Sequence, residues 1–197
     1  MKKNLAQRRS WFFMLPLFLL LAGSAAAAQF SALMMIKDGA KVVTGKIYVQ
    51  DGRLRQEFSD EEGQTITIVR PDKKAIWFIM PHERAYVEMP LKKKLPGQFI
   101  QIPNDALSKR LVGKETVAGY EAEKYQVTMR EAGGPEIQII WVATKLGTPV
   151  KMTSRGGNFS MEYQSIKEGP QADRLFELPP GYKKLAAPDL APSWKGY

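Results

Sequence analysis

Apolar and polar residues alternate with a period of two along most of the chain after Gln29. Successive side chains of a β-strand point to opposite faces, so this alternation predicts half-buried antiparallel strands. Asp51-Gly52 and Gly156-Gly157-Asn158 are turn sequences that join strands into hairpins. The predicted strands, about ten in number, begin near Phe30, Val43, Arg53, Ile66, Ala75, Arg84, Glu123, Ile137, Pro149 and Phe159.

Two segments depart from simple alternation. Residues 75–80 are apolar on both faces, which predicts a central strand that is covered on both sides. Residues 104–112 begin with the capping pair Asn104-Asp105, contain four apolar residues and precede Gly113, which predicts a short helix. We expect this helix to be the only one in the mature chain.

The predicted fold class is mainly β, a curled antiparallel sheet with one short helix. Twisted sheets of this width either close or bend around a core, and a single helix cannot cover so much apolar surface. The sheet therefore either closes as a barrel or stays a half-open gutter with a concave apolar face. The second arrangement predicts a ligand groove.

The apolar face of these strands is the candidate ligand site, and a packed barrel interior is the structural alternative. Methionine favours the ligand site slightly, because its flexible thioether suits adaptable binding surfaces, and the chain has nine methionines. The candidate groove residues are Met34, Ile36, Ile47, Val49, Leu54, Phe58, Ile66, Ile68, Phe78, Met80, Val127, Met129, Ile139, Trp141, Met152, Met161 and Tyr163.

The first 28 residues have the features of a secretory signal peptide. A basic start is followed by the apolar run Trp11–Ala22 and by Ala26-Ala27-Ala28, which offers a cleavage site. The run is shorter than the roughly 20 apolar residues that span a bilayer. We therefore expect cleavage near Ala28, a periplasmic protein and no stable membrane anchor afterwards.

The amino-acid composition limits the kinds of site and partner that the chain can have. The chain has no cysteine, which excludes disulfides, thiolate metal sites and an acylated N-terminal cysteine. Without residues 1–28 the chain has 169 residues and a net charge of +5, spread too evenly to predict a nucleic-acid partner. We expect a signal peptide at 1–28, one domain at 29–185 and a flexible tail at 186–197.

Catalytic chemistry finds little support. The single histidine, His82, lies in a turn sequence, and the chain has no nucleophile elbow. Asp60-Glu61-Glu62 is typical of a solvated turn rather than a metal site. We expect no enzyme activity, no cofactor and no metal. Lys92-Lys93-Lys94 fits either a solvated loop or a contact with anionic lipid headgroups or an acidic partner surface.

Two segments resemble the bacterial lipoprotein carriers LolA and LolB. The first is residues 69–81, Val-Arg-Pro-Asp-Lys-Lys-Ala-Ile-Trp-Phe-Ile-Met-Pro. It resembles a strand-turn-strand segment of the carriers that contains the sequence Leu-Trp-Phe-Tyr-Asn-Pro. The second is residues 173–182, which resemble the Phe-x-Phe-x-Pro-Pro-x-Gly sequence near the end of the carriers. Tyr163 and the expected helix at 104–112 fall where that family has a strand and a helix. The resemblance implies a LolA-like unclosed barrel that shelters acyl chains beneath a helical lid.

The chain also departs from these carriers. Its first strand begins almost at the mature terminus, whereas the carriers begin with a helix. Where they have a lid-holding arginine in a Lys-Arg-Pro turn, this chain has Gln50-Asp51-Gly52-Arg53, so Arg53 or Arg55 is a candidate substitute. We expect a periplasmic protein, near the family's small uncharacterised members, that binds a lipid or an acylated ligand. The alternative is a module of the same fold that binds an envelope protein as a sensor or regulator.

Overall fold

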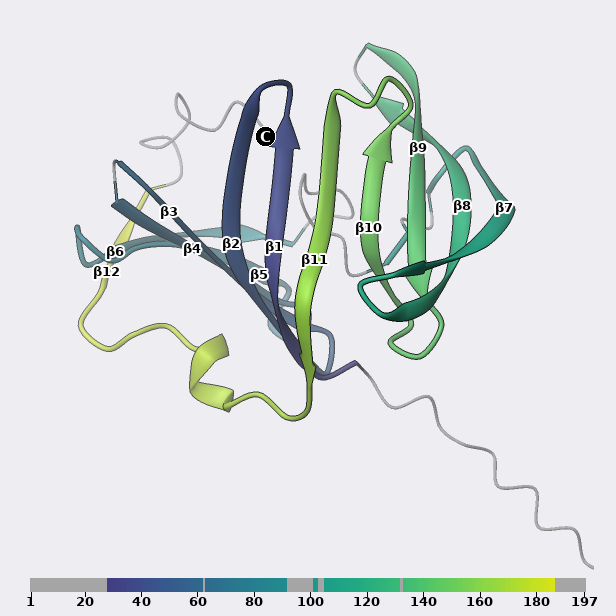
Figure 1. The fold of residues 1–197 in the computed structure, drawn as a ribbon. Coiled ribbons are helices and arrows are strands. Elements are labelled where there is room, and N and C mark those ends of the chain that lie inside the picture. The colour runs from purple at the N-terminus through teal and green to yellow at the C-terminus, as the bar shows by residue number, and fades with distance from the viewer. Residues whose placement is uncertain (1–27, 62, 92–100, 103–104, 132, 187–197) are drawn as a thin grey trace, which may run out of the picture.

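The computed structural model describes residues 28–61, 63–91, 101–102, 105–131 and 133–186. These residues form one twelve-stranded sheet in the spatial order β12-β6-β5-β4-β3-β2-β1-β11-β10-β9-β8-β7 (Figure 1). The strands are β1 (Phe30–Asp38), β2 (Lys41–Gln50), β3 (Arg53–Asp60), β4 (Gly63–Arg70), β5 (Ala75–Met80), β6 (Ala85–Pro90), β7 (Ser108–Val117), β8 (Tyr120–Glu131), β9 (Gly134–Ala143), β10 (Thr148–Ser154), β11 (Phe159–Glu168) and β12 (Lys183–Leu185). All pairs are antiparallel except the parallel β12–β6 pair, and the edge strands β12 and β7 leave the sheet unclosed. The predicted mainly β class and the half-open alternative are confirmed.

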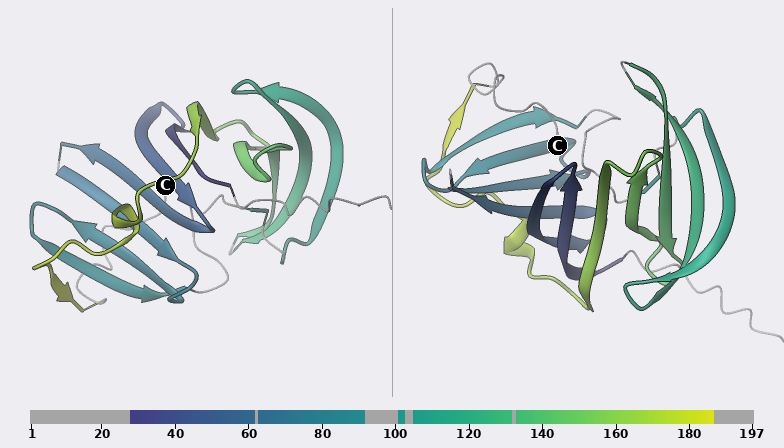
Figure 2. Two further views of the ribbon diagram at one scale, coloured as in Figure 1. Left: turned by 90° about the horizontal axis from the view of Figure 1, so that it is seen from below. Right: turned by 45° about the horizontal axis from the view of Figure 1, so that its top comes forward.

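The first strand lies in the middle of the sheet. Strands β2–β6 form one meander and β7–β11 a second, and β1 joins them by pairing with β2 on one side and β11 on the other. Figure 2 shows that the sheet bends strongly between these two halves. The bend gives the sheet an inner and an outer face.

The predicted helix at 104–112 is wrong over its described C-terminal part, because residues 108–112 belong to strand β7. The turn Ala118-Gly119, with φ of 51° and 84°, joins β7 to β8 in a hairpin. Positive φ at both turn residues matches the twist of a two-residue hairpin, so the turn favours the strand. Leu111, one of the apolar residues of the predicted helix, is 50% exposed on β7.

Apolar clusters cover both faces of the sheet. The inner cluster draws residues from both meanders and from β1. The outer cluster is smaller and combines side chains of β4 and β5 with Phe176 of the short 3-10 helix η1 (Asp173–Phe176). Strand β5 supplies Ile76 to the first cluster and Trp77 to the second, which confirms that it is covered on both faces.

Some predictions fall outside the described residues. The expected signal peptide is described only at Ala28, and Lys92-Lys93-Lys94 and residues 187–197 are not described. The domain boundaries therefore stay predictions. In the described ranges, no helix is long and apolar enough to cross a membrane.

Candidate functional site at the inner face of the sheet

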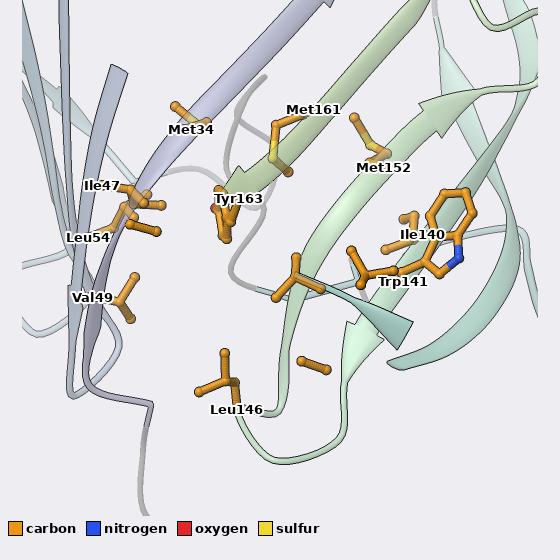
Figure 3. Close-up of a cluster of buried hydrophobic side chains, with 14 of the residues drawn as sticks. Met34, Ile47, Val49, Leu54, Ile140, Trp141, Leu146, Met152, Met161 and Tyr163 are labelled. Atoms are coloured by element: carbon orange, nitrogen blue, oxygen red, sulfur yellow. The ribbon is translucent and has the colours of Figure 1, made fainter. Parts of the chain in front are cut away.

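The inner face is a continuous apolar surface that crosses the bend of the sheet. Apolar residues that pair across neighbouring strands make this surface continuous: Leu54 lies opposite Val49, and Met34 lies opposite Tyr163. Figure 3 shows side chains from both meanders converging on this face. Most of the candidate groove residues lie here: Met34, Ile36, Ile47, Val49, Leu54, Phe58, Phe78, Val127, Met129, Met152, Met161 and Tyr163. Met80 shares this face because it alternates with Ile79 along β5, as Ile76 and Phe78 do.

Four candidates lie on the opposite face. Ile66 and Ile68 pack in the outer cluster around Phe176, so their expected place on the inner face is corrected. Ile139 and Trp141 alternate with the inner residue Ile140 and start from the other side of β9, where Lys124 and Lys151 lie over the Trp141 ring. Trp141 nevertheless belongs to the same buried cluster, and Ile139 packs against it. The physical reasons differ. In β4 the isoleucines alternate with threonines, and Phe176, which is distant in sequence, covers them. Strand β9 is apolar on both faces, so period two alone cannot say which face turns inwards.

The inner cluster also contains buried residues that the sequence-based site omits. Phe30 is fully buried, and its ring lies 6.1 Å from that of Tyr163, between centroids. The omitted residues are Phe30, Ala32, Val69, Ile76, Val117, Ala122, Ile140, Ala143, Leu146 and Val150. The alternation from Phe30 to Ile36 already placed Phe30 and Ala32 on one face. The face of Ile140 could not be predicted, because its neighbours in β9 are apolar too.

Methionines meet at the centre of the inner face. Met152 of β10 lies opposite Met161 of β11, and Met34 of β1 adjoins Tyr163 of β11. The buried amide of Gln56 donates a hydrogen bond to the Met34 sulfur at 3.8 Å. Unbranched thioethers can repack around differently shaped partners, so this part of the face is chemically suited to an apolar ligand.

Three described residues of the connection from β6 to β7 pack over part of the inner face. These strands lie near opposite edges of the sheet, and the described connecting residues Leu91, Ile102 and Ala106 pack against the inner cluster. Met34 and Met161 are at most 2% exposed. A ligand that reaches them must therefore displace what covers them.

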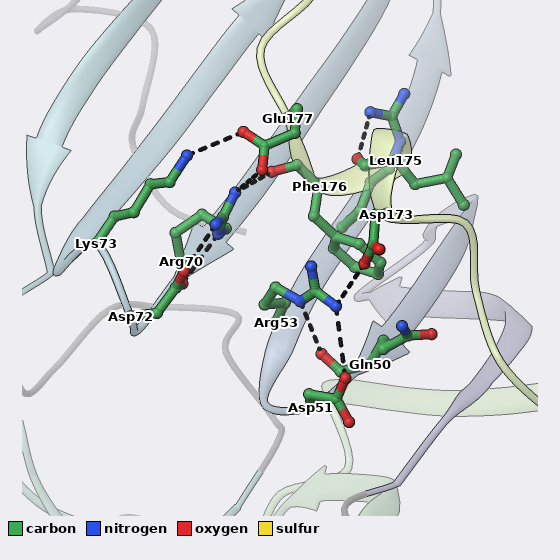
Figure 4. A network of polar contacts seen from close by, with 11 residues as sticks. Gln50, Asp51, Arg53, Arg70, Asp72, Lys73, Asp173, Leu175, Phe176 and Glu177 are labelled. Atoms are coloured by element: carbon green, nitrogen blue, oxygen red, sulfur yellow. Dashed lines mark hydrogen bonds and ion pairs between the residues drawn. The ribbon is translucent and has the colours of Figure 1, made fainter.

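The outer face holds the C-terminal segment 171–178, which we call the strap, through arginines of β3 and β4 (Figure 4). Arg70 donates to the Phe176 carbonyl at 2.8 Å and to a Glu177 carboxylate oxygen at 2.6 Å. It also pairs with Asp72 at 2.7 Å. The buried guanidinium is thus satisfied on three sides, which is the condition for keeping a buried charge.

These ion pairs shift the titration of their partners. The hydrogen bond from Arg70 lowers the pKa of Asp72 to about 2, and the bond to Asp72 in turn raises the pKa of Arg70. Lys73, and then Arg70, lower the pKa of Glu177. Asp72 and Glu177 are about half exposed, so solvent screens the ion pair that each forms with Arg70. The buried Arg70 guanidinium is therefore the energetically important group of this network.

Arg53 and Arg55 bind the strap rather than a lid on the inner face. Arg53 donates to Asp173 at 2.9 Å, and Arg55 donates to the Leu175 carbonyl at 3.0 Å. Both side chains project outwards, opposite to Leu54. The hypothesis that one of them replaces the carriers' lid-holding arginine is therefore corrected.

His82 lies exposed in the turn between β5 and β6. Within the described ranges, no group of three or more His, Asp or Glu side chains is arranged to hold a metal ion. The apolar inner face is therefore the candidate site that the described geometry offers.

An unclosed, strongly bent sheet with an apolar inner face defines a LolA-like fold, as the resemblance implied. The chain belongs to the family described as a domain of unknown function, DUF4412, whose family model matches residues 31–148. The matched range runs from β1 to the first residue of β10. None of the curated proteins compared matches the sequence.

Solved structures share this fold at low sequence identity. An uncharacterized conserved protein from Thermus thermophilus superposes with a TM-score of 0.56 at 13% identity, covering 82% of this chain and 91% of that chain. A chain of the Pseudomonas aeruginosa MucA/MucB complex superposes with a TM-score of 0.51 at 16% identity, covering 79% of this chain. The match spans 57% of that Pseudomonas chain. At these identities the likeness establishes the fold alone.

Proposed function

We propose that this is a non-enzymatic periplasmic protein that holds a lipid or an acylated ligand, such as a lipoprotein, on the inner face of its sheet. The observation that carries the proposal is the continuous apolar inner face with methionines at its centre. The described residues Leu91, Ile102 and Ala106 of the connection between β6 and β7 pack over part of this face. Displacing a connection breaks fewer ladder hydrogen bonds than opening a sheet.

The energy available to an acyl ligand is large. Burial of one methylene contributes about 0.8 kcal/mol, so roughly 14 methylenes contribute on the order of 10 kcal/mol before ordering costs. Moving Leu91, Ile102 and Ala106 off the inner cluster opposes this gain. Enough remains for tight binding only when most of the acyl chain is buried.

The matched pair Met34→Gln and Met35→Gln tests the proposal, because these neighbours lie on opposite faces of β1. Met34 is inner and buried, and Met35 is outer and partly exposed. We expect Met34→Gln to weaken binding of a fluorescent fatty acid at least about fivefold, since a buried amide costs about 1–3 kcal/mol. Met35→Gln should bind like the wild type.

Circular dichroism must show both variants folded. Native mass spectrometry of wild-type protein from gently extracted periplasm should show an acyl adduct. Consistently ligand-free spectra, together with no binding of the fluorescent fatty acid, would refute the carrier proposal.

The periplasmic location has its own test. The basic and apolar order of residues 1–28 supports export and cleavage. Fractionation of cells expressing the full chain should place it in the periplasm, and N-terminal sequencing should begin at Gln29. A cytoplasmic protein that retains Met1 would contradict the location.

A second candidate function, recognition of an envelope protein, is favoured by edge strand β7. Nine of its ten residues are exposed, including Leu111 and Val112. A long open edge can accept an extended segment of a partner by adding a strand. The MucA/MucB complex shows that a neighbour of this fold assembles with another protein.

The two functions predict opposite effects of two substitutions. Protein recognition through β7 predicts that Leu111→Asp abolishes complex formation with a purified envelope partner while Met34→Gln preserves it. The carrier proposal predicts that Leu111→Asp still binds the fluorescent fatty acid normally.

A further inference from the structure

Tyr163 places a polar atom within the apolar inner face. It lies on β11 opposite Met34, and its ring packs against Phe30. The residue is 1% exposed. Figure 3 shows it among Met34 and Met161, at the centre of the inner cluster.

The Tyr163 hydroxyl forms no hydrogen bond with any described residue, in contrast to the other two tyrosines of the second meander. Tyr120 donates to Glu168, and Tyr125 donates to Glu123. Across the described ranges, no fully enclosed side-chain oxygen or nitrogen lacks a partner. The Tyr163 hydroxyl is therefore not fully enclosed, and it keeps a small solvent-accessible area.

Such a hydroxyl is available as a donor. Burial raises the pKa of Tyr163, so the phenol keeps its proton throughout the physiological range. Its neighbours Phe30 and Met161 are apolar, and a thioether such as Met34 accepts hydrogen bonds only weakly. Because an unmade hydrogen bond in an apolar setting is unfavourable, a ligand oxygen at this place gains affinity.

We propose that the Tyr163 hydroxyl donates a hydrogen bond to the carbonyl oxygen of a bound acyl group, so that the inner face selects acyl esters and fatty acids over plain hydrocarbon chains. This inference rests on the proposed carrier function. It assigns Tyr163 a positioning role: the acyl tail lies along the methionines, and the carbonyl carbon is fixed near β11.

The test compares ligands of similar length with and without a carbonyl group. Binding of methyl laurate, lauric acid and tetradecane is measured by displacement of a fluorescent fatty acid from wild-type protein, Tyr163→Phe and Tyr48→Phe. Tyr48 is the matched control, because it packs against the outer cluster. The phenylalanine variants keep the rings and remove only the hydroxyls.

We expect Tyr163→Phe to bind methyl laurate about fivefold more weakly, which corresponds to one net hydrogen bond of about 1 kcal/mol. Its affinity for tetradecane should be unchanged, and Tyr48→Phe should match the wild type for every ligand. A greater loss for lauric acid than for methyl laurate would show that the hydroxyl binds the carboxyl group more strongly than the ester. Equal losses would identify the shared carbonyl as the group recognised.

Equal effects of Tyr163→Phe on methyl laurate and tetradecane, or no effect on either, would overturn the inference and leave the carrier proposal standing. Failure of wild-type protein to bind any of the three ligands would overturn both. Thermal unfolding supplies an independent check. Because its hydroxyl is unbonded, Tyr163→Phe should unfold at the wild-type temperature or higher, and a clear decrease would show that the hydroxyl supports the fold instead.

Discussion

The strap on the outer face gives the most quantitative prediction. Phe176 of the strap is fully buried against strands β3–β5, and the Arg53 guanidinium lies 4.9 Å from its ring centroid. Truncation of a buried phenylalanine to alanine costs about 3–5 kcal/mol. The lower value applies here, because a surface segment can partly close over the missing ring. We therefore expect Phe176→Ala to lower the free energy of unfolding by about 3 kcal/mol.

For a chain of this size, 1 kcal/mol corresponds to about 2–4 °C in melting temperature, so Phe176→Ala should melt roughly 6–12 °C lower. Circular dichroism measures the shift. Arg174→Ala is the control, since it changes an exposed neighbour on the same 3-10 helix and should leave the melting temperature unchanged.

Hydrogen exchange distinguishes global from local loss of stability. The Lys183 amide, bonded to the Arg84 carbonyl, should exchange faster in Phe176→Ala if the strap alone detaches. A melting temperature within about 1 °C of wild type, together with unchanged exchange at Lys183, would refute the view that Phe176 anchors the C-terminal segment.

Two further predictions concern acid stability and close packing. The folded pKa of Asp72 is about 2, below its ordinary value of 3.8, so its contribution to stability is present above about pH 4 and is lost as the pH falls towards 2. Acid titration of Arg70→Met should show this part of the pH dependence flattened, and an unchanged profile would contradict the assignment. Gly45→Ala should lower stability by about 1–3 kcal/mol in urea unfolding, because its new Cβ would lie 2.6 Å from the Glu57 carbonyl oxygen. Gly113→Ala, which meets nothing within 4 Å, should behave like the wild type.

The sequence was most informative where one face of a strand is apolar and the other polar. The alternation around Met34 and Leu54 placed both on the inner face correctly. It gave the wrong face for Ile68, because the adjacent threonines look solvent-facing while the strap, distant in sequence, covers the isoleucine. Face assignment there depends on a tertiary contact, and local pattern does not contain it.

The edges of the sheet were harder to predict than its centre. Strand β7 carries apolar residues at spacings that also fit a short helix, and its pairing with β8 depends on the Ala118-Gly119 turn. The three-residue strand β12 is too short for alternation to detect. The unbonded state of the Tyr163 hydroxyl could not be predicted either. The sequence places the aromatic ring on one face of the strand but does not show whether its oxygen has a hydrogen-bond partner.

The central position of β1 has a consequence for how the molecule can be divided. A cut in the connection between β6 and β7 leaves each meander intact, and β1 then belongs to one fragment while β11 belongs to the other. The strap and β12 also reach from the second fragment back to the first. The two pieces, expressed separately, should recognise each other and reassemble, which would make this fold a natural scaffold for split-protein reporters.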